Sequence, residues 1–342
     1  MQNVIETGLG KFSKEKFNAL LNVRGAALMA LRAALVKEGY TEVSTSSLVN
    51  IAGSCENPYA SFTLNYYGRE AHLSQSAQLQ LEALVIRLRR GVFTVNNSFR
   101  EENYDDPAAE GRRLSEFTLV EPEKPYPDMT AEEALDEIIK IEEKIIKSVV
   151  KEVLSQCEAD IALLGGKVDY LKSILDKPFT RLTYDDALDF LNKRGGSYKF
   201  GDDLEIREER EILAHFDDLS TFVTHYPAKI KFFNMKRTSD GERVYSVDLL
   251  TPRLGETSGG AVREEDGEKI KRWLLDSKVA KYINEKGGDP LEPFKEYFNL
   301  FEQEEALLRG GFGIGFERLV GFLLHSNDIL ETIAYRAMQP GK

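Results

Sequence analysis

Three groups of residues in this chain combine arginines, carboxylates and glycines at spacings that would let them act together. In the first, Phe99-Arg100-Glu101-Glu102 is followed by a polar loop and then by Arg113 and Phe117. An arginine fixed on a strand can bind a phosphate and a carboxylate through its planar guanidinium group. A phenylalanine on the returning strand can stack on a flat ring. Taken alone, the same residues could equally form a charged hairpin in solvent.

The second group is Gly311-Phe-Gly-Ile-Gly-Phe-Glu-Arg318, in which glycines alternate along an expected strand. Alternate glycines, Gly315 among them, remove the side chains from one face, so a flat ligand can lie against the backbone. Arg318 follows at the start of a helix, where it can reach a phosphate. The glycine spacing differs from that of the dinucleotide-binding fingerprint. The alternative is a glycine-rich bend that serves packing only.

The third group places two carboxylates, Asp248 and Glu256, on either side of an expected turn. Such a pair can hold Mg²⁺ against the phosphates of a nucleotide. Gly259-Gly260 and Arg263 follow, and an arginine beyond a glycine pair can reach into a pocket to bind a carboxylate. Taken alone, an exposed acidic turn would account for this pattern better.

The elements expected to position these groups are strands with helices on one side. Hydrophobic periodicity predicts helices at 25–38 and 78–88, and Thr130 with Glu133 forms a capping box that opens a long helix. The predicted strands lie at 40–49, 62–67, 71–74, 92–99, 114–122, twice within 230–250, and in the first part of 311–324. Residues 158–222 give weak signals and are interpreted as an insertion in a single domain spanning 1–342. Most strands would be antiparallel, so the predicted fold class is α+β.

Composition limits the classes of protein to which the chain can belong. Of its 342 residues 42% are hydrophobic, which suits a full core and not a disordered chain. The formal net charge is −12, and an acidic chain disfavours nucleic acid because phosphate contacts require lysine and arginine. The two cysteines, Cys55 and Cys157, make no disulfide framework. The sequence has no uninterrupted run of 18 apolar residues and no leader pattern, so a cytoplasmic protein with no membrane partner is expected.

Together the three groups resemble the motifs of class II aminoacyl-tRNA synthetases. Residues 99–117 are similar to motif 2 of that family, and residues 311–318 are similar to motif 3. The order of the matching stretches is also that of the family, from about residue 19 to residue 334. Further stretches resemble the aspartate and asparagine branch, and the asparaginyl members closely: Leu73-Ser-Gln-Ser-Ala-Gln-Leu79, 225–237 and 247–264.

The resemblance implies an antiparallel sheet flanked by helices, a homodimer, and ATP and Mg²⁺ as cofactors. It also implies roles for single residues: Arg100 and Arg318 in catalysis, and Phe117 with Arg318 on either side of the adenine. The residues assigned to ATP are Arg100, Glu102, Arg113, Phe117, Asp248, Glu256, Gly315 and Arg318, of which Asp248 and Glu256 would also bind the metal. The residues assigned to the amino-acid substrate are Glu56, Gln78, Glu82, Arg100 and Arg263.

One position bears on which amino acid is bound. Aspartate-specific members carry a lysine three residues after the position of Gln78, whereas this chain has Leu81 followed by Glu82, as in asparagine-specific members. A carboxylate facing the substrate side chain accepts hydrogen bonds from a carboxamide and repels a second carboxylate. Arg263 would pair with the side-chain oxygen. The pocket therefore resembles an asparagine site, which would also suit an enzyme that makes asparagine and releases it.

Several features depart from the family. Only about 18 residues precede the catalytic core, so no anticodon-binding barrel is expected. The motif 2 loop, residues 103–110, contains Asp105, Asp106 and Glu110, which would repel phosphates. For these reasons tRNA is not expected as a partner. A tyrosine of the family's Phe-Tyr-Met stretch is replaced by Asn234.

The leading interpretation is an ATP-dependent, AMP-forming ligase that adenylates aspartate and transfers it to ammonia or another amine, as in asparagine biosynthesis. The archaeal type of asparagine synthetase resembles a truncated asparaginyl-tRNA synthetase in this way. The alternative is a truncated asparaginyl-tRNA synthetase-like enzyme that activates asparagine for tRNA or another acceptor. A third interpretation, a non-catalytic paralogue that senses an amino acid or nucleotide, is disfavoured because Arg100, Arg263 and Arg318 are all present.

Overall fold

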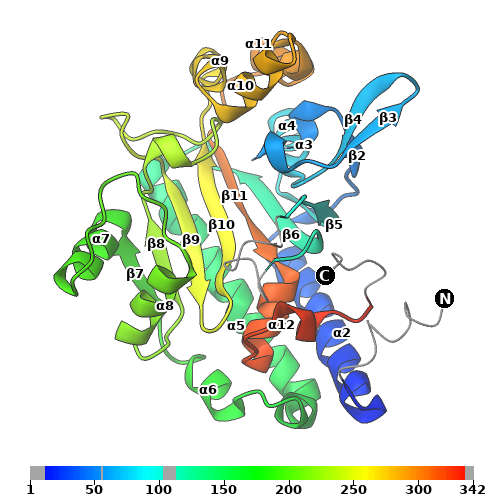
Figure 1. Ribbon diagram of the computed structural model, residues 1–342, viewed down its shortest axis with the longest axis vertical. Helices are drawn as coiled ribbons and strands as arrows, with labels where there is room; N and C mark the ends of the chain where they lie inside the picture. The colour runs from blue at the N-terminus through cyan, green and yellow to red at the C-terminus, as the bar shows by residue number, and fades with distance from the viewer. Residues whose placement is uncertain (1–11, 55–56, 103–112, 336–342) are drawn as a thin grey trace.

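The computed structural model describes residues 12–54, 57–102 and 113–335 (Figure 1). In this part of the chain, eight strands form a large sheet in the order β1-β5-β6-β11-β10-β9-β8-β7, which is antiparallel except where its edge strands β1 and β7 pair parallel with β5 and β8. Its strands are β1 (Thr41–Glu42), β5 (Val92–Phe99), β6 (Glu116–Pro125), β7 (Thr180–Thr183), β8 (Thr221–Thr224), β9 (Ser246–Thr251), β10 (Gly255–Arg263) and β11 (Arg309–Gly315). The predicted α+β class and the class II type of sheet are confirmed.

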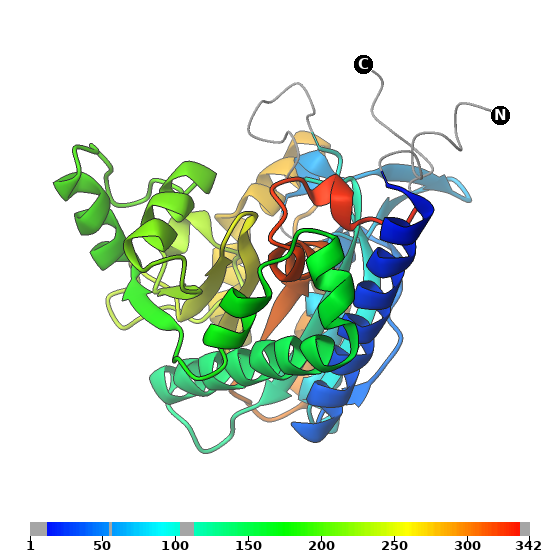
Figure 2. The same cartoon turned by 90° about the horizontal axis from the view of Figure 1, so that it is seen from below.

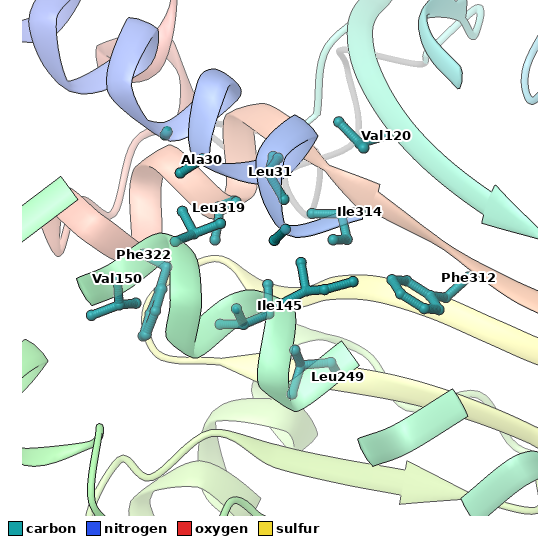
Figure 3. Close-up of a cluster of buried hydrophobic side chains, with 14 of the residues drawn as sticks. Ala30, Leu31, Val120, Ile145, Val150, Leu249, Phe312, Ile314, Leu319 and Phe322 are labelled. Atoms are coloured by element: carbon teal, nitrogen blue, oxygen red, sulfur yellow. The ribbon is translucent and has the colours of Figure 1, made fainter. Parts of the chain in front are cut away.

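Three long or apolar helices cover one face of the large sheet (Figures 1 and 2). They are α2 (Lys14–Lys37), α5 (Ala131–Leu163) and α12 (Phe316–Leu324). Figure 3 shows the layer between helices and strands, where Leu31 of α2 and Ile145 of α5 lie near Leu249, Phe312 and Ile314 of the sheet. All five side chains are buried. This core supports the large sheet from one side, and the strands turn their other face away from the helices.

The helices of this layer form where local signals and burial agree. Thr130 and Glu133 make the predicted capping box at the start of α5, in which each side chain accepts from the other residue's backbone N–H. The helix then buries one apolar stripe along its length. By length and composition α2 could also cross a membrane, but half of its most apolar window is buried and it packs against α5. Leu20 and Leu35 on α2 are fully buried, so the apolar side of this helix serves the core.

A second unit of structure lies beside the upper end of the large sheet in Figure 1. The small sheet has the order β2-β4-β3, and α4 begins after it. Helices α9 to α11 pack next to α4 around an apolar cluster that includes Leu79, Phe233 and Phe294. The elements are β2 (Leu48–Val49), β3 (Thr63–Tyr66), β4 (Arg69–Leu73), α3 (Ile51–Ser54), α4 (Gln78–Leu88), α9 (Gly267–Leu275), α10 (Lys278–Glu285) and α11 (Lys295–Gln303).

Local signals predicted some elements well and others poorly. The structure has α4 at the predicted bounds and the hairpin β3–β4 around Gly68. The predicted strand at 40–49 is wrong, because only Thr41–Glu42 and Leu48–Val49 pair, and they pair in different sheets. Within 230–250 one strand forms, β9, and the first candidate contributes only isolated bridges. Short edge strands form only where a neighbouring strand supplies hydrogen-bond partners. The propensity of the local sequence does not contain that information.

Residues 158–222 were interpreted as an insertion, and their domain status stays a prediction. They contain α6 (Val168–Ser173), α7 (Tyr184–Lys193), α8 (Ile206–His215) and the strands β7 and β8. The two strands extend the large sheet, since β8 pairs antiparallel with β9. The helices α7 and α8 pack beside this edge around a cluster that includes Tyr184, Leu213 and Val223. The segment is thus continuous with the sheet and not separated from it.

Candidate active site

The residues singled out in the sequence lie on the face of the large sheet that the core helices do not cover. Side chains alternate across a strand, and Val247, Leu249 and Val262 take the core face of β9 and β10. Asp248 and Arg263 must therefore point to the opposite face. The register extends this face across the sheet, since Gly259 pairs with Asp248 on one side and with Gly313 on the other.

Two glycines on this face make room for charged groups. A Cβ atom added at Gly259 would lie 3.1 Å from Oε1 of Glu256 and 3.3 Å from Oδ1 of Asp248. A Cβ atom at Gly311 would lie 2.3 Å from Oε2 of Glu123 and 2.1 Å from the carbonyl oxygen of Pro122. Gly311 needs glycine because the Pro122 carbonyl and the Glu123 carboxylate occupy the space above its backbone, whereas a side chain at Gly259 would require the two carboxylates to shift slightly. The alternate glycines therefore serve the charges of the site as well as any flat ligand.

Asp248 and Glu256 converge over Gly259, as the sequence predicted for a metal-binding pair. Lys231 joins them from the loop before β9, with its Nζ 2.6 Å from Oδ2 of Asp248. The backbone N–H of Glu256 donates to Oε2 of Glu209 on α8, at 3.2 Å. This cluster, here called the phosphate end, contains three carboxylates and one lysine.

The electrostatics of the phosphate end favour an added cation. Burial raises the pKa of Asp248 to about 6; Lys231 works against this shift, and Glu256 adds to it. Burial works to lower the pKa of Lys231, but Asp248 and Glu256 together raise it above its ordinary value. A divalent ion stabilises the ionised form of a buried carboxylate that lies next to a second one.

The residues of the phosphate end fit a magnesium ion bound together with a nucleotide. No group of three or more metal-binding side chains occurs in the described residues, so a site built from protein ligands alone is absent there. Mg²⁺ usually keeps several waters and is held by one or two carboxylates plus substrate phosphates. Asp248 and Glu256, which share the space over Gly259, are a donor set of this kind.

Arginines border the phosphate end. Arg318, in the first turn of α12, donates through Nη1 to the carbonyl oxygen of Glu256 and lies 3.7 Å from its carboxylate. Arg100 follows β5, with its guanidinium carbon 5.9 Å from the centre of the Phe117 ring. These contacts place Arg100 and Phe117 together, as predicted, and bring Arg318 to the predicted metal ligand Glu256.

Glu102 and Arg113 also meet, although they stand on opposite sides of the motif 2 loop. Nη1 of Arg113 lies 3.2 Å from Oε2 of Glu102, and Nε of Arg100 lies 3.9 Å from Oε1 of the same carboxylate. The Glu102 side chain is 7% exposed, whereas that of Arg113 is 41% exposed. The structure therefore groups these three predicted residues, with Glu102 bridging the two arginines.

The other end of the face, here called the amino-acid end, is built around Glu82 on α4. Its Oε1 accepts from Nε2 of Gln78 at 3.2 Å and from Nδ2 of Asn234. Its Oε2 accepts from the Tyr297 hydroxyl at 2.9 Å and from Nη2 of Arg309 at 2.6 Å. Glu82 is completely buried. Both oxygens therefore accept hydrogen bonds from the protein, and a direct contact between Glu82 and a substrate stays a prediction.

Arg263 lies next to this carboxylate but is held by another. Its Nε and Nη2 each lie 3.2 Å from an oxygen of Glu123 on β6, and its Nε is 3.9 Å from Oε1 of Glu82. The pairing of Arg263 with Arg309 across β10 and β11 brings the two guanidinium groups together. Two glutamates and two arginines therefore balance one another in the buried amino-acid end.

The remaining predicted residues have different outcomes. Gln78 lies in the first turn of α4 and contacts Glu82, so it belongs to the amino-acid end. Gly315 is the last residue of β11 and precedes Arg318 by less than one helical turn. Glu56 and the acidic residues of the motif 2 loop lie outside the described residues.

Sequence reasoning missed Lys231, Glu123, Tyr297 and Arg309. Arg309 stands directly before the alternating glycines, on the same face as Gly311, so strand alternation could have indicated it. Glu123 lies on β6 an even number of residues after Phe117, so strand alternation places both on the same face and could also have indicated Glu123. No local signal marks Tyr297, since α11 contacts α4 only in the folded protein.

An open antiparallel sheet face with arginines at its strand ends and paired carboxylates over glycines defines a catalytic domain of the class II aminoacyl-tRNA synthetase type. A family model described as "tRNA synthetases class II (D, K and N)" matches residues 5–339, so the chain belongs to this family. It is 34% identical to an asparagine–tRNA ligase of Pyrococcus furiosus, covering 92% of this chain and 67% of that protein. It is 33% identical to one of Xylella fastidiosa, covering 86% and 60% respectively.

The structural comparison gives the same result. The model superimposes with a TM-score of 0.81 on asparaginyl-tRNA synthetase from Pyrococcus horikoshii complexed with asparaginyl-adenylate. The two are 34% identical, and the match covers 94% of this chain and 68% of that one. The chain thus spans about two thirds of the length of these relatives.

These relatives correct the expectation about tRNA. The chain was not expected to have tRNA as a partner, but its relatives are named as ligases of asparagine and tRNA, so that expectation is wrong. That expectation was based on the apparent lack of an anticodon-binding barrel, on the acidic residues of the motif 2 loop and on a net charge of −12. Net charge sums the whole surface, whereas phosphate contacts depend on local charge. The names also support the asparagine-activating alternative more than the leading interpretation of aspartate–ammonia ligation.

Proposed function

We propose that this protein activates asparagine with ATP, forming asparaginyl-adenylate and pyrophosphate, and that tRNA accepts the activated amino acid. The observation that carries the proposal is the separation of one sheet face into a charge-balanced amino-acid end and an electronegative phosphate end. The relative with the similar structure was solved with asparaginyl-adenylate, a molecule whose two halves would lie on two such ends.

Each end would contribute a separate part of the chemistry. Arg100 would hold the substrate carboxylate against the α-phosphate, where negative charge grows during attack. Arg318 would neutralise the phosphates from the start of α12. Mg²⁺, held by Asp248 and Glu256 together with the phosphates, would supply positive charge to the departing pyrophosphate.

The proposal is tested by amino-acid-dependent exchange of labelled pyrophosphate into ATP, followed by transfer of labelled asparagine to total tRNA. We expect exchange with asparagine, dependence on Mg²⁺, AMP as the nucleotide product, and acid-precipitable label on tRNA. Formation of ADP would overturn adenylation. Exchange with aspartate but not with asparagine, or labelled asparagine formed from aspartate and ammonium, would overturn the substrate assignment.

We also propose that the protein works as a homodimer in the cytoplasm. Support for the dimer comes from the outer side of α2, where Leu21, Met29 and Val36 are 42%, 66% and 59% exposed. Apolar residues exposed along one helix favour a protein partner. Light scattering on the purified protein should give twice the chain mass of 38.7 kDa, and Met29→Glu should shift it toward the monomer.

A further inference from the structure

The amino-acid end contains a buried side chain to which the resemblance assigns no role. Asn234 lies beside the end of β10, where its carbonyl oxygen accepts from the backbone N–H of Glu264 at 2.9 Å. The residue is completely buried. Its carboxamide is therefore a polar group enclosed by the protein.

The orientation of the Asn234 amide is determined by its neighbour. Nδ2 donates to Oε1 of Glu82, and an ionised carboxylate can only accept, so the NH₂ group must face Glu82. Oδ1 must then point away from that carboxylate. It is buried, and no described residue donates a hydrogen bond to it. Buried acceptors without a partner are rare in folded proteins, and each one calls for an explanation such as a ligand.

A free donor accompanies this free acceptor. Arg263 uses Nε and Nη2 to bind Glu123, and among the described residues its Nη1 has no hydrogen-bond partner. Arg263 and Asn234 are neighbours, since both approach the same oxygen of Glu82 and Arg263 bridges to the next residue, Met235. The amino-acid end therefore contains one buried acceptor and one donor that no described residue uses.

We propose that Asn234 is the residue that selects the substrate side chain. Its Oδ1 accepts from the NH₂ of a side-chain carboxamide, and Nη1 of Arg263 donates to the carboxamide oxygen. Glu82 is a positioning residue, which holds the Asn234 amide in the orientation that presents oxygen. The assignment rests on the proposed activation of asparagine.

The same arrangement excludes aspartate. A carboxylate side chain brings acceptors only, so one of its oxygens would face Oδ1 of Asn234 with no proton between them. Leaving a buried acceptor unpaired and opposed to a negative charge is the kind of mismatch that gives strong discrimination.

The test measures the ratio of kcat/KM for asparagine to kcat/KM for aspartate in pyrophosphate exchange. Asn234→Leu keeps the shape of the side chain and removes its donor and acceptor, and we expect the ratio to fall about 10–100-fold with the KM for ATP unchanged. Asn234→Ser, which is smaller and keeps a hydroxyl group, should reduce the ratio partially and provides the measurement where the leucine variant does not fold. Ser220→Ala is the matched control, since it also removes a buried polar atom without a partner, outside the site.

The positioning role of Glu82 has its own readout. Glu82→Gln lets the Asn234 amide rotate, so it should lower the same ratio, and Glu82→Gln combined with Asn234→Leu should lower it no further than Asn234→Leu alone. Additive losses would overturn the positioning role. An unchanged ratio in both Asn234 variants would overturn the selection role of Asn234. Absence of exchange by the unmodified protein would instead overturn the proposed function, and the inference with it.

Discussion

The amino-acid end and the phosphate end lie on one sheet face but neutralise their charges in different ways. At the amino-acid end, Glu82 and Glu123 are matched by Arg309 and Arg263, and all four side chains are at most 5% exposed. The phosphate end contains three carboxylates, Asp248, Glu256 and Glu209, and two cations: Lys231 pairs with Asp248, and Arg318 lies 3.7 Å from Glu256, whose side chain is 43% exposed. The buried charges of the amino-acid end are paired within the protein, whereas the phosphate end has more carboxylates than cations.

This difference indicates that the amino-acid end discriminates between substrate side chains, whereas the phosphate end attracts a cation. A compensated buried network holds its donors and acceptors in one arrangement, so it can discriminate between side chains of similar size. A partly exposed carboxylate cluster cannot discriminate in that way, but it attracts a cation and, through it, phosphates. Substitutions that alter only one end test this difference.

The largest effect should come from Arg309→Leu, which leaves Glu82 buried without its bidentate partner. Breaking a buried ion pair on one side costs roughly 3–5 kcal/mol of unfolding free energy. Urea denaturation of both proteins measures the loss. Arg87→Leu is the control, because the pair of Arg87 with Glu304 lies at the surface and should contribute less than about 1 kcal/mol. Equal losses in the two variants would show that the amino-acid end is not a tightly coupled network.

A second prediction concerns Glu142, a buried carboxyl group beneath the phosphate end. This residue of α5 is 1% exposed, and burial raises its pKa to about 8; a hydrogen bond from Ser258 opposes this shift and the charge of Asp248 adds to it. The folded protein must therefore keep a proton that the unfolded chain loses above pH 4.5. Stability is complete below that pH and falls as the pH rises toward 8.

Glu142→Gln removes this titration. Relative to the unmodified protein, its unfolding free energy should rise by about 2–3 kcal/mol between pH 5 and pH 9, within an upper bound of about 5 kcal/mol for the full shift. Denaturant titrations at several pH values give the curve. Glu152→Gln, on an exposed position of the same helix, should leave the pH dependence as it was. A parallel pair of curves for Glu142→Gln and the unmodified protein would contradict burial of a neutral carboxyl.

Arg318→Ala should affect catalysis and not folding. Loss of a charged hydrogen bond to phosphate costs roughly 1.5–3 kcal/mol, which is about 10–150-fold in kcat/KM for ATP. Pyrophosphate exchange at limiting ATP measures it. Arg210→Ala serves for comparison, since Arg210 donates to the carbonyl oxygen of Arg253 and not to the site. An equal loss of rate in both variants would remove Arg318 from the phosphate end.

The smallest effect concerns the pH dependence of metal binding. Asp248, with a pKa of about 6 caused mainly by burial, must lose its proton before it can bind Mg²⁺. Its affinity for the metal should therefore be about tenfold lower at pH 5 than at pH 7. Calorimetric titration with MgCl₂ in the presence of ATP measures the change. Asp248→Asn should bind weakly at both pH values, and an undiminished tenfold change in this variant would assign the titration to another group.

Much of the fold could be predicted because its signals are local. The capping box of Thr130 and Glu133, the bounds of α4, and the hairpin at Gly68 each depend on residues close in sequence. The strands β1 and β2 could not be predicted, because two-residue strands exist only where a neighbouring strand supplies their hydrogen bonds. The same limit applied to β7 and β8, which a weak local pattern left without a place in the sheet.

The sequence by itself determined the family, the face of each strand that carries charge, and the convergence of Asp248 with Glu256. These follow from motif order and from the period of two along a strand, which are properties of the chain alone. Only the tertiary structure decided which charge is paired with which. Arg263 binds Glu123, Arg309 binds Glu82, and Asn234 is left with a free oxygen, because those partners come from four separate elements that meet only when β6, β10 and β11 are in register and α4 is packed against them.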